Sequence, residues 1–152
     1  MIRTAKPEDA GLITHFNFLL ALETENLKLD KEILLRGVNE LLADPKKGTY
    51  FLCEREGRVV GQLMITKEWS DWRCGYFAWI QSVYVEKEFR RKGVFSELFR
   101  HVQKMVWESP EYCGVRLYVD RHNENAQVAY ARLGMKESNY LFYEMEKSIP
   151  RD

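Results

Sequence analysis

The sequence predicts a mixed α+β fold, in which helices cover a sheet in the order β-α-α-β-β-β-α-β-α-β. Apolar residues recur at three-and-four spacing in several segments, which is typical of helices with one buried face. Runs rich in β-branched and aromatic residues, bounded by charges or turn residues, lie between these segments. No internal repeat or low-complexity tract interrupts the order, so residues 1–152 are expected to form a single domain.

The N-terminal part predicts a short extended start and two helices. Residues 2–4 are expected to be extended, and Pro7-Glu8-Asp9 places a proline and two carboxylates where the first turn of a helix favours them. Asp30 is the expected cap of the second helix, and residues 44–48, which include Pro45 and Gly48, end it. The apolar stripes of the two helices are Leu12, Ile13, Phe16, Leu19 and Leu20, then Leu34, Val38, Leu41 and Leu42.

The middle of the chain predicts three strands. Residues 49–54 and 59–66 flank a turn around Glu56-Gly57, which favours a hairpin. Residues 68–75 are expected to be a polar, tryptophan-bearing connection, and residues 77–85 form the next strand.

A basic turn follows this strand and leads into a helix. Phe89-Arg90-Arg91-Lys92-Gly93-Val94 has its only glycine where the helical spacing from Phe95 to Val106 begins. A helix start leaves about four N–H groups unpaired and carries partial positive charge. With cationic side chains beside it, the turn is a candidate site for a phosphate or pyrophosphate, and a solvated loop is the alternative interpretation.

The C-terminal part predicts a strand, a helix and a last strand. Residues 114–120 read as a strand, and Asn123 caps a compact helix that Gly134 closes. Residues 140–146 (YLFYEME) are predicted to be the final strand.

Composition excludes several classes of function. The chain has 23 Lys and Arg against 23 Asp and Glu, so its net charge recruits neither nucleic acid nor an acidic membrane. Its three cysteines and three histidines show no spacing typical of a disulfide framework or a metal site. No signal peptide or membrane-spanning run is evident, so a cytoplasmic protein is expected.

Two motifs make the chain resemble the GNAT superfamily of acyl-CoA N-acyltransferases over nearly its whole length. The family pattern Gln/Arg-x-x-Gly-x-Gly/Ala is met by Arg90 and Gly93, whereas Phe95 replaces the small residue at its end. The pattern Asn-x-x-Ala-x-x-x-Tyr is met by Asn123, Ala126 and Tyr130, followed by Arg132-Leu133-Gly134. Both motifs occur in the family's order with a predicted strand between them, which is more specific than either motif alone.

The resemblance implies a mainly antiparallel sheet and binding of acetyl-CoA. The main chain of Val83, Tyr84 and Val85 would hold the pantetheine arm, and an N–H near Val85 would polarise the acetyl carbonyl. The turn would hold the pyrophosphate, and Asn123, Ala126 and Tyr130 would complete the coenzyme site. The residues implied for the turn are Arg90, Arg91, Lys92, Gly93, Val94, Phe95 and Ser96.

The resemblance also implies that Tyr130 is the catalytic acid. A phenol with a pKa near ~10 is protonated at neutral pH and can donate to a departing thiolate. A general base is not evident, because Gln81 and Ser82 lie where some family members carry a carboxylate. His122 is a further candidate because it lies at the end of a predicted strand, close in sequence to the site, and a surface or capping role is the alternative for it.

The acceptor is expected to be a primary amine of a small molecule or peptide. Trp69, Asp71, Trp72 and Gln81 are the candidate acceptor residues, because indole faces beside a carboxylate suit an organic cation. A hydrophobic loop folded on the sheet, or a contact in a homodimer, is the other interpretation of the tryptophans. Two further functions stay open: a noncatalytic acyl-CoA-binding module, and a nucleic-acid binder that uses the basic turn.

Overall fold

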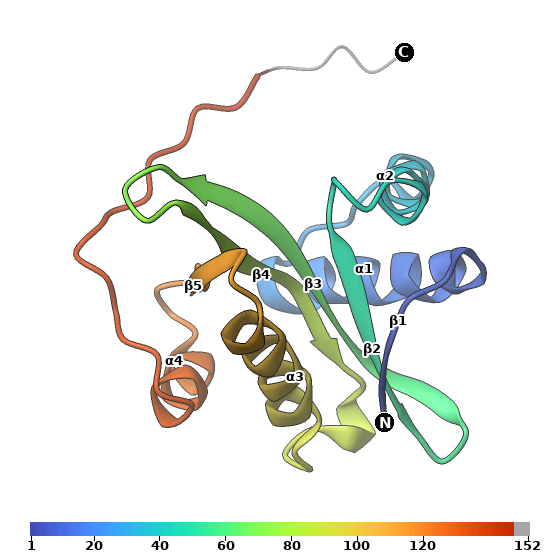
Figure 1. The fold of residues 1–152 in the computed structure, drawn as a ribbon. Helices are drawn as coiled ribbons and strands as arrows, with labels where there is room; N and C mark the ends of the chain where they lie inside the picture. Colours follow the sequence, from blue (N-terminus) through green and yellow to red (C-terminus); the bar gives the residue numbers. More distant parts are fainter. Residues whose placement is uncertain (148–152) are drawn as a thin grey trace. The chain divides into compact units, whose positions relative to one another are not determined.

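The computed structural model describes residues 1–147, and the chain forms two compact units. The first unit, Met1–Tyr118, contains the whole sheet and three α-helices (Figure 1). The second unit begins at Val119, and its described residues contain one α-helix, α4.

The elements of the first unit alternate as the spacing of apolar residues predicts. Its strands are β1 (Ile2–Thr4), β2 (Thr49–Arg55), β3 (Arg58–Ser70), β4 (Gly75–Val85) and β5 (Tyr112–Leu117). Its helices are α1 (Ala10–Glu25), α2 (Lys31–Ala43) and α3 (Val94–Glu108), with short 3-10 helices η1 (Pro7–Asp9) and η2 (Lys87–Phe89). In the second unit, α4 spans Glu124–Arg132.

The sheet is mixed and mainly antiparallel, in the order β1-β2-β3-β4-β5. β1 to β4 pair antiparallel with their neighbours, and β5 pairs parallel with β4 after the crossover through α3. The predicted fold class is thus confirmed. The parallel pairing of β4 with β5 is possible because the connection between them, which includes α3, is long enough to cross the sheet.

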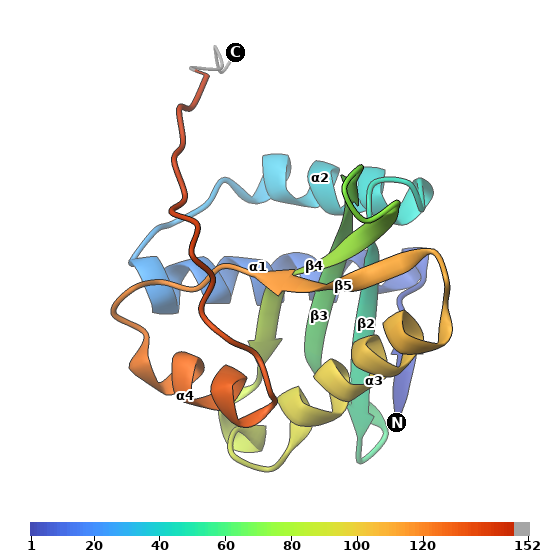
Figure 2. The ribbon, with the colours of Figure 1, turned by 60° about the vertical axis from the view of Figure 1, so that its left-hand side comes forward.

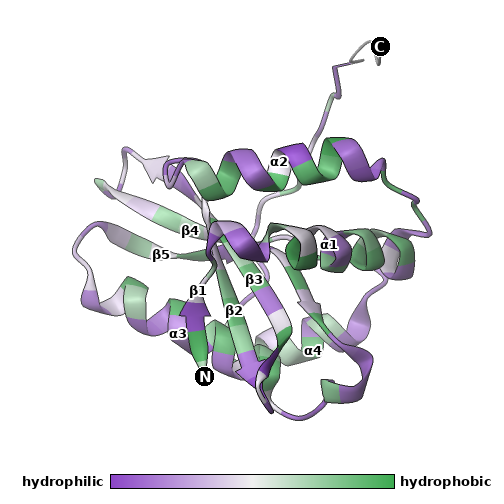
Figure 3. Ribbon diagram, turned by 90° about the vertical axis from the view of Figure 1, so that its right-hand side faces the viewer, coloured by the Kyte–Doolittle hydropathy of each residue, from purple (hydrophilic) through white to green (hydrophobic). Residues whose placement is uncertain are grey.

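Helices cover both faces of this sheet (Figures 1 and 2). On one face α1 and α2 bury Ile13 and Val38 against Tyr50, Leu52 and Met64. On the other face lies α3, whose buried residues are Val94, Leu98, Phe99, Val102 and Val106. Figure 3 shows α1 apolar along most of its length, and α2 with alternating polar and apolar stripes. α1 contacts both the sheet and α2, which accounts for its larger apolar surface.

The sequence-based boundaries are wrong at two places in the first unit. Residues 68–75 are not a polar connection: β3 continues to Ser70 and β4 begins at Gly75, so a short turn closes a long hairpin. Cross-strand pairing continues through Trp69 and Tyr76, which the isolated sequence does not reveal. The strand predicted over residues 114–120 is β5, Tyr112–Leu117.

The predicted last strand is also wrong. Residues 140–146 belong to no strand in the described structure, and their large apolar side chains are exposed. A strand needs a neighbour for its N–H and C=O groups, and the alternation of side chains alone does not provide one.

Candidate functional site

The candidate site begins where the sheet opens at the end of β4. The ladder between β4 and β5 ends at Ile80↔Leu117, whereas β4 continues to Val85. Among the described strands, none pairs with residues 81–85 on the β5 side. Peptide groups on that side face an opening that an extended molecule could enter as an added strand. Val83, Tyr84 and Val85, the residues predicted to hold a pantetheine arm, form this edge.

A bulge breaks the other side of β4 at the same level. The pairing with β3 shifts register between Gln62 and Met64, and Ser82 has φ +49°, in the left-handed region. The fully buried Gln62 holds the bulge, because its Nε2 donates to the Ser82 carbonyl at 3.0 Å and to Asn17 Oδ1 at 2.8 Å. Asn17 Nδ2 donates in turn to the Tyr50 hydroxyl at 2.9 Å, and burial raises the pKa of that phenol.

The turn after β4 presents the start of α3. Gly93 is the N-cap with φ +82°, and Arg91 also has a positive φ of +62°. No described side chain caps this helix, so its first N–H groups point out of the turn. Val94 anchors the start of α3 to β3: a Cβ on Gly61 would lie 2.8 Å from Val94 Cγ1. Glycine at position 61 therefore allows the helix start to lie close against the sheet.

Arg90 fastens the turn to both β4 and α1. Its Nε donates to the Val85 carbonyl at 2.8 Å, and its Nη2 donates to Glu23 at 2.6 Å. The Tyr84 hydroxyl donates to the same carboxylate at 3.2 Å, and burial together with Glu23 raises the pKa of that phenol. The guanidinium of Arg90 thus has partners within the protein, and it orders the backbone that carries the site.

The remaining residues of the turn divide into exposed cations and packed side chains. Arg91 and Lys92 are exposed, and the Lys92 ammonium lies 5.5 Å from the Phe89 ring centroid. The Phe95 ring packs on Phe99 one helical turn further, with centroids 6.1 Å apart. The bulky residue at the family's small position therefore lies along its own helix. Ser96 is half-buried in the first turn of α3.

In the second unit, α4 carries the other predicted motif. Asn123 is its N-cap, and the Asn123 Oδ1 accepts from the Ala126 N–H at 3.2 Å. Ala126 and Tyr130 are one turn apart and share a face of the helix. Burial raises the pKa of the Tyr130 phenol. Gly134, with φ +92°, follows the end of the helix as predicted.

The structure does not bring the four candidate acceptor residues together. Gln81 lies at the bulge, where its Nε2 donates to Thr66 Oγ1 at 2.7 Å. Trp69, Asp71 and Trp72 lie at the tip of the β3–β4 hairpin. Five residues of β4 lie between Gly75 and Gln81, which places these two positions about 20 Å apart. Trp72 is 83% exposed, and Trp69 makes an edge contact with the Tyr76 ring.

Between these two positions lies a polar and aromatic cluster, in which sequence reasoning points to the aromatic residues of β4 and misses Glu68 and Arg116. Glu68 accepts from Trp79 Nε1 at 2.9 Å and from Arg116 at 2.6 Å, and the Arg116 guanidinium lies 3.6 Å from the Phe77 ring centroid. Gln81 is two residues after Trp79 in β4, so it lies on the same face of the strand as this cluster. The register between β3, β4 and β5 brings these side chains together, and local sequence patterns do not reveal that register.

Glu23, Asn17 and Gln62 are also missed. Asn17 and Gln62 could have been noticed as polar residues within apolar runs: Asn17 lies in the apolar stripe of α1, and Gln62 lies beside Leu63. Glu23 carries no such signal.

The described residues contain no group of three or more His, Cys, Asp or Glu side chains that could hold a metal ion. Nor does any helix among them have the length and apolarity needed to cross a membrane.

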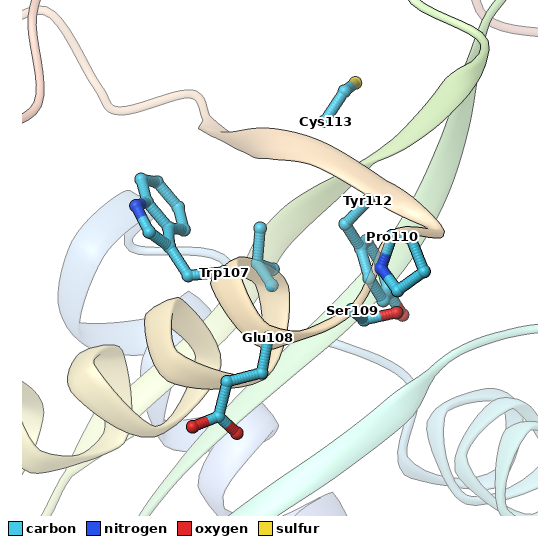
Figure 4. A pocket seen from close by; sticks show the side chains of 7 residues that line it. Trp107, Glu108, Ser109, Pro110, Tyr112 and Cys113 are labelled. Carbon is cyan, nitrogen blue, oxygen red and sulfur yellow. The ribbon is translucent and has the colours of Figure 1, made fainter.

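A shallow pocket of about 470 Å³ lies where α3 passes into β5, away from the turn (Figure 4). Its lining is Val106, Trp107, Glu108, Ser109, Pro110, Tyr112 and Cys113.

The site thus consists of a bulged strand that opens beside its parallel neighbour and leads into a helix start without a side-chain cap. Residues 16–135 match the acetyltransferase (GNAT) family, and the chain belongs to that family. No curated protein matches the sequence.

Solved structures agree with this assignment. The chain is similar to a possible acetyltransferase from Clostridium difficile 630, with 46% identity, 97% of each chain covered and a TM-score of 0.92. A structure described as a probable acetyltransferase has 22% identity, 99% of each chain covered and a TM-score of 0.84. Ribosomal-protein-alanine N-acetyltransferase from Brucella melitensis has 16% identity, covers 97% of this chain and 99% of its own, and has a TM-score of 0.74. The last two show the fold alone.

Proposed function

We propose that the protein transfers an acetyl group from acetyl-CoA to a primary amine of a small molecule or peptide. The observation that carries the proposal is the open edge of β4, which runs directly into the uncapped start of α3. An extended amide arm followed by a diphosphate matches these two features in the same order.

The residues present fit such a donor. Peptide groups of Val83 and Val85 would pair with the arm, and the N–H groups after Gly93 would bind the diphosphate, with Arg91 and Lys92 as exposed cations beside it. Arg90 contributes by ordering this backbone through Val85 and Glu23. The predicted contacts of Asn123 and Ala126 with the coenzyme are part of the same proposal.

The reaction requires one bond to form and one to break. Acetyl-CoA supplies a thioester, whose carbonyl carbon the neutral amine attacks while the C–S bond breaks. A main-chain N–H near Val85 stabilises the developing oxyanion. Tyr130 gives its phenolic proton to the departing thiolate, and the raised pKa keeps that phenol protonated at neutral pH. Since Gln81 cannot act as a base, the acceptor reacts as the neutral amine. As the amide forms, its nitrogen releases one proton to water, and water returns a proton to the Tyr130 phenolate, so that the products are the amide and the free thiol of CoA.

The acceptor approaches over the face of β4 that carries Gln81 and Trp79. Glu68 adds a carboxylate there, although Arg116 shares it. Trp69, Asp71 and Trp72 can contribute only if the acceptor also reaches the hairpin tip, about 20 Å from Gln81. An extended acceptor such as a polyamine or a peptide meets that requirement, and a compact amine does not.

The noncatalytic acyl-CoA-binding module remains the second candidate, because Gln81 stands where a base is expected. Calorimetry with acetyl-CoA, followed by release of free thiol across a panel of compact amines, polyamines and peptides, separates the two functions. Binding with turnover supports the proposal. Binding without turnover on the whole panel favours the module, and failure to bind acetyl-CoA contradicts both.

A further inference from the structure

Two arginines lie against one aromatic ring near the tip of the β3–β4 hairpin. The guanidinium of Arg116, from β5, lies 3.6 Å from the Phe77 ring centroid, and that of Arg73, from the hairpin turn, lies 5.1 Å from it. A Cβ on Gly114, which is opposite Phe77 in β5, would lie 2.9 Å from the ring, so glycine at this position makes room for the ring. Like charges held beside one ring repel each other, and a bound anion would relieve that repulsion.

Glu68 is the one carboxylate among the described residues that pairs with either arginine. It accepts from Arg116 Nη1 at 2.6 Å, whereas Arg73 donates to a neutral partner, Ser70 Oγ, at 3.4 Å. Asp71, in the same turn as Arg73, accepts from the main-chain N–H that follows it. A guanidinium has several N–H donors, and these single bonds use only part of them. Two guanidinium groups thus share one bonded carboxylate.

This cluster lies on the face of β4 over which the acceptor is proposed to approach. Phe77, Trp79 and Gln81 alternate along β4, so their side chains point to the same face. The four residues of strand from Phe77 to Gln81 correspond to a rise of about 13 Å. In Figure 1 the tip of the hairpin extends beyond the ends of α1 and α2, so these helices leave the tip uncovered.

We propose that Arg73 and Arg116 bind a carboxylate of the acceptor, and that the acceptor is a peptide with an acidic side chain at its fourth or fifth residue. The inference rests on the proposed function, which brings the reacting amine to the level of Gln81. An extended peptide rises about 3.3 Å per residue, so an N-terminal amine and an acidic residue four positions further span the distance from Gln81 to Phe77. The planar edge of a guanidinium suits a carboxylate, which accepts parallel N–H bonds from it.

The same cluster disfavours a polyamine. The amines of such a molecule are positively charged near neutral pH and would meet two guanidinium groups at this level, while Arg116 already holds the Glu68 carboxylate. Between the cluster and Gln81, the Trp79 and Tyr118 rings lie with their centroids 5.6 Å apart. Their surfaces suit the side chains of an extended peptide.

Pairs of matched peptides test the subsite. Peptides of eight residues carry a single Glu, placed in turn at each position from 2 to 7, or Gln at the same position. With wild-type protein and acetyl-CoA, kcat/KM for the Glu peptide should exceed that for its Gln partner about tenfold at position 4 or 5, because a charge-assisted hydrogen bond is gained. An equal ratio at every position would indicate attraction by overall charge, and would overturn the subsite.

Arg73→Gln tests the guanidinium that has no bonded carboxylate. Arg73 is exposed in the turn, so the fold should be kept, and the preference for Glu over Gln should fall to about one. Lys67→Gln is the matched control, because Lys67 pairs with Glu111 on the opposite face of the same hairpin and the substitution removes the same charge. It should keep the preference. A tenfold preference that persists in Arg73→Gln contradicts the proposal.

Glu68→Gln tests the sign of the charge that the cluster binds. The amide keeps an acceptor oxygen for Arg116 or Trp79 and removes the competing carboxylate. The Glu peptide should therefore bind several-fold more tightly to this variant than to wild type. Weaker binding of a linear polyamine, with binding of the Glu peptide unchanged, would show that Glu68 recognises a cation and would overturn the proposal.

Calorimetry with CoA bound separates failure of this inference from failure of the proposed function, since it needs no acetyl transfer. A protein that transfers nothing, yet binds the Glu peptide more tightly than the Gln peptide through Arg73, supports the subsite and contradicts the transferase. Transfer at rates that ignore the peptide's charge overturns the subsite alone. Failure to bind any of the peptides also overturns it.

Discussion

Tyr130 lies on α4 with its side chain partly buried, and burial raises the pKa of its phenol. We predict that Tyr130→Phe lowers kcat about 10²–10⁴-fold with little change in the KM for acetyl-CoA, because the ring remains and only the proton donor is lost. Steady-state kinetics with an acceptor found by the amine panel measure this. Tyr76→Phe, at the far end of β4, is the control and should retain activity. An unchanged kcat in Tyr130→Phe would remove the phenol from the mechanism.

Gly93 has a φ of +82° at the start of α3, and the space where a Cβ would stand is open. Gly93→Ala is expected to cost about 1 kcal/mol from backbone strain and to weaken acetyl-CoA binding, since the strain turns the N–H groups of the turn. Gly57 is a matched control, with φ +76° and equally open space in the β2–β3 turn. Thermal unfolding should show a similar loss in both variants, and calorimetry a weaker affinity in Gly93→Ala alone. Equal affinities would mean that the turn does not bind the coenzyme.

Among the secondary-structure elements, the bulge in β4 depends on one buried amide. Gln62→Leu removes the donor to Ser82 and Asn17, and we expect a loss of about 2 kcal/mol in the free energy of unfolding with weaker acetyl-CoA binding. Chemical denaturation and calorimetry give the two values. Gln127→Leu, which removes an exposed amide on α4, should stay within about 0.5 kcal/mol of wild type. A Gln62→Leu variant with wild-type affinity would show that the bulge is not needed for the coenzyme.

For the whole molecule, stability should depend on pH through the Arg3–Asp9 pair. Arg3 donates to both Asp9 oxygens, at 2.8 and 3.0 Å, and this lowers the pKa of the carboxyl below its ordinary value. A lowered folded-state pKa stabilises the fold fully above the unfolded pKa of about 3.9 and loses that effect as pH falls through the folded value.

Asp9→Asn should therefore cost about 2 kcal/mol at pH 7, and the difference from wild type should shrink below about pH 4. Thermal unfolding between pH 2 and pH 7 measures the difference. Asp44 is the control, because its carboxylate pairs with Lys47 on an exposed surface, and Asp44→Asn should have little effect at any pH. A constant difference for Asp9→Asn across the range would rule out this linkage.

Local patterns were enough to predict most element positions and caps. The Asp30 side chain accepts from Glu32 and Ile33 at the start of α2, and Gly93 and Gly134 mark helix ends with a positive φ. These features depend on hydrogen bonds and backbone conformation within a few residues, so they can be predicted from the local sequence. The family motifs likewise indicated which turn to examine.

The geometry of the site required the tertiary structure. The opening between β4 and β5, the bulge at Ser82 and the hairpin that carries Trp69 all follow from cross-strand register. Glu23, which holds Arg90 from 67 residues away, has no local signature. Residues 140–146 have the pattern of a strand and form none, because pairing depends on a partner edge. Helix caps act between sequence neighbours, whereas register and ion pairs join distant segments, and only the folded chain brings those segments together.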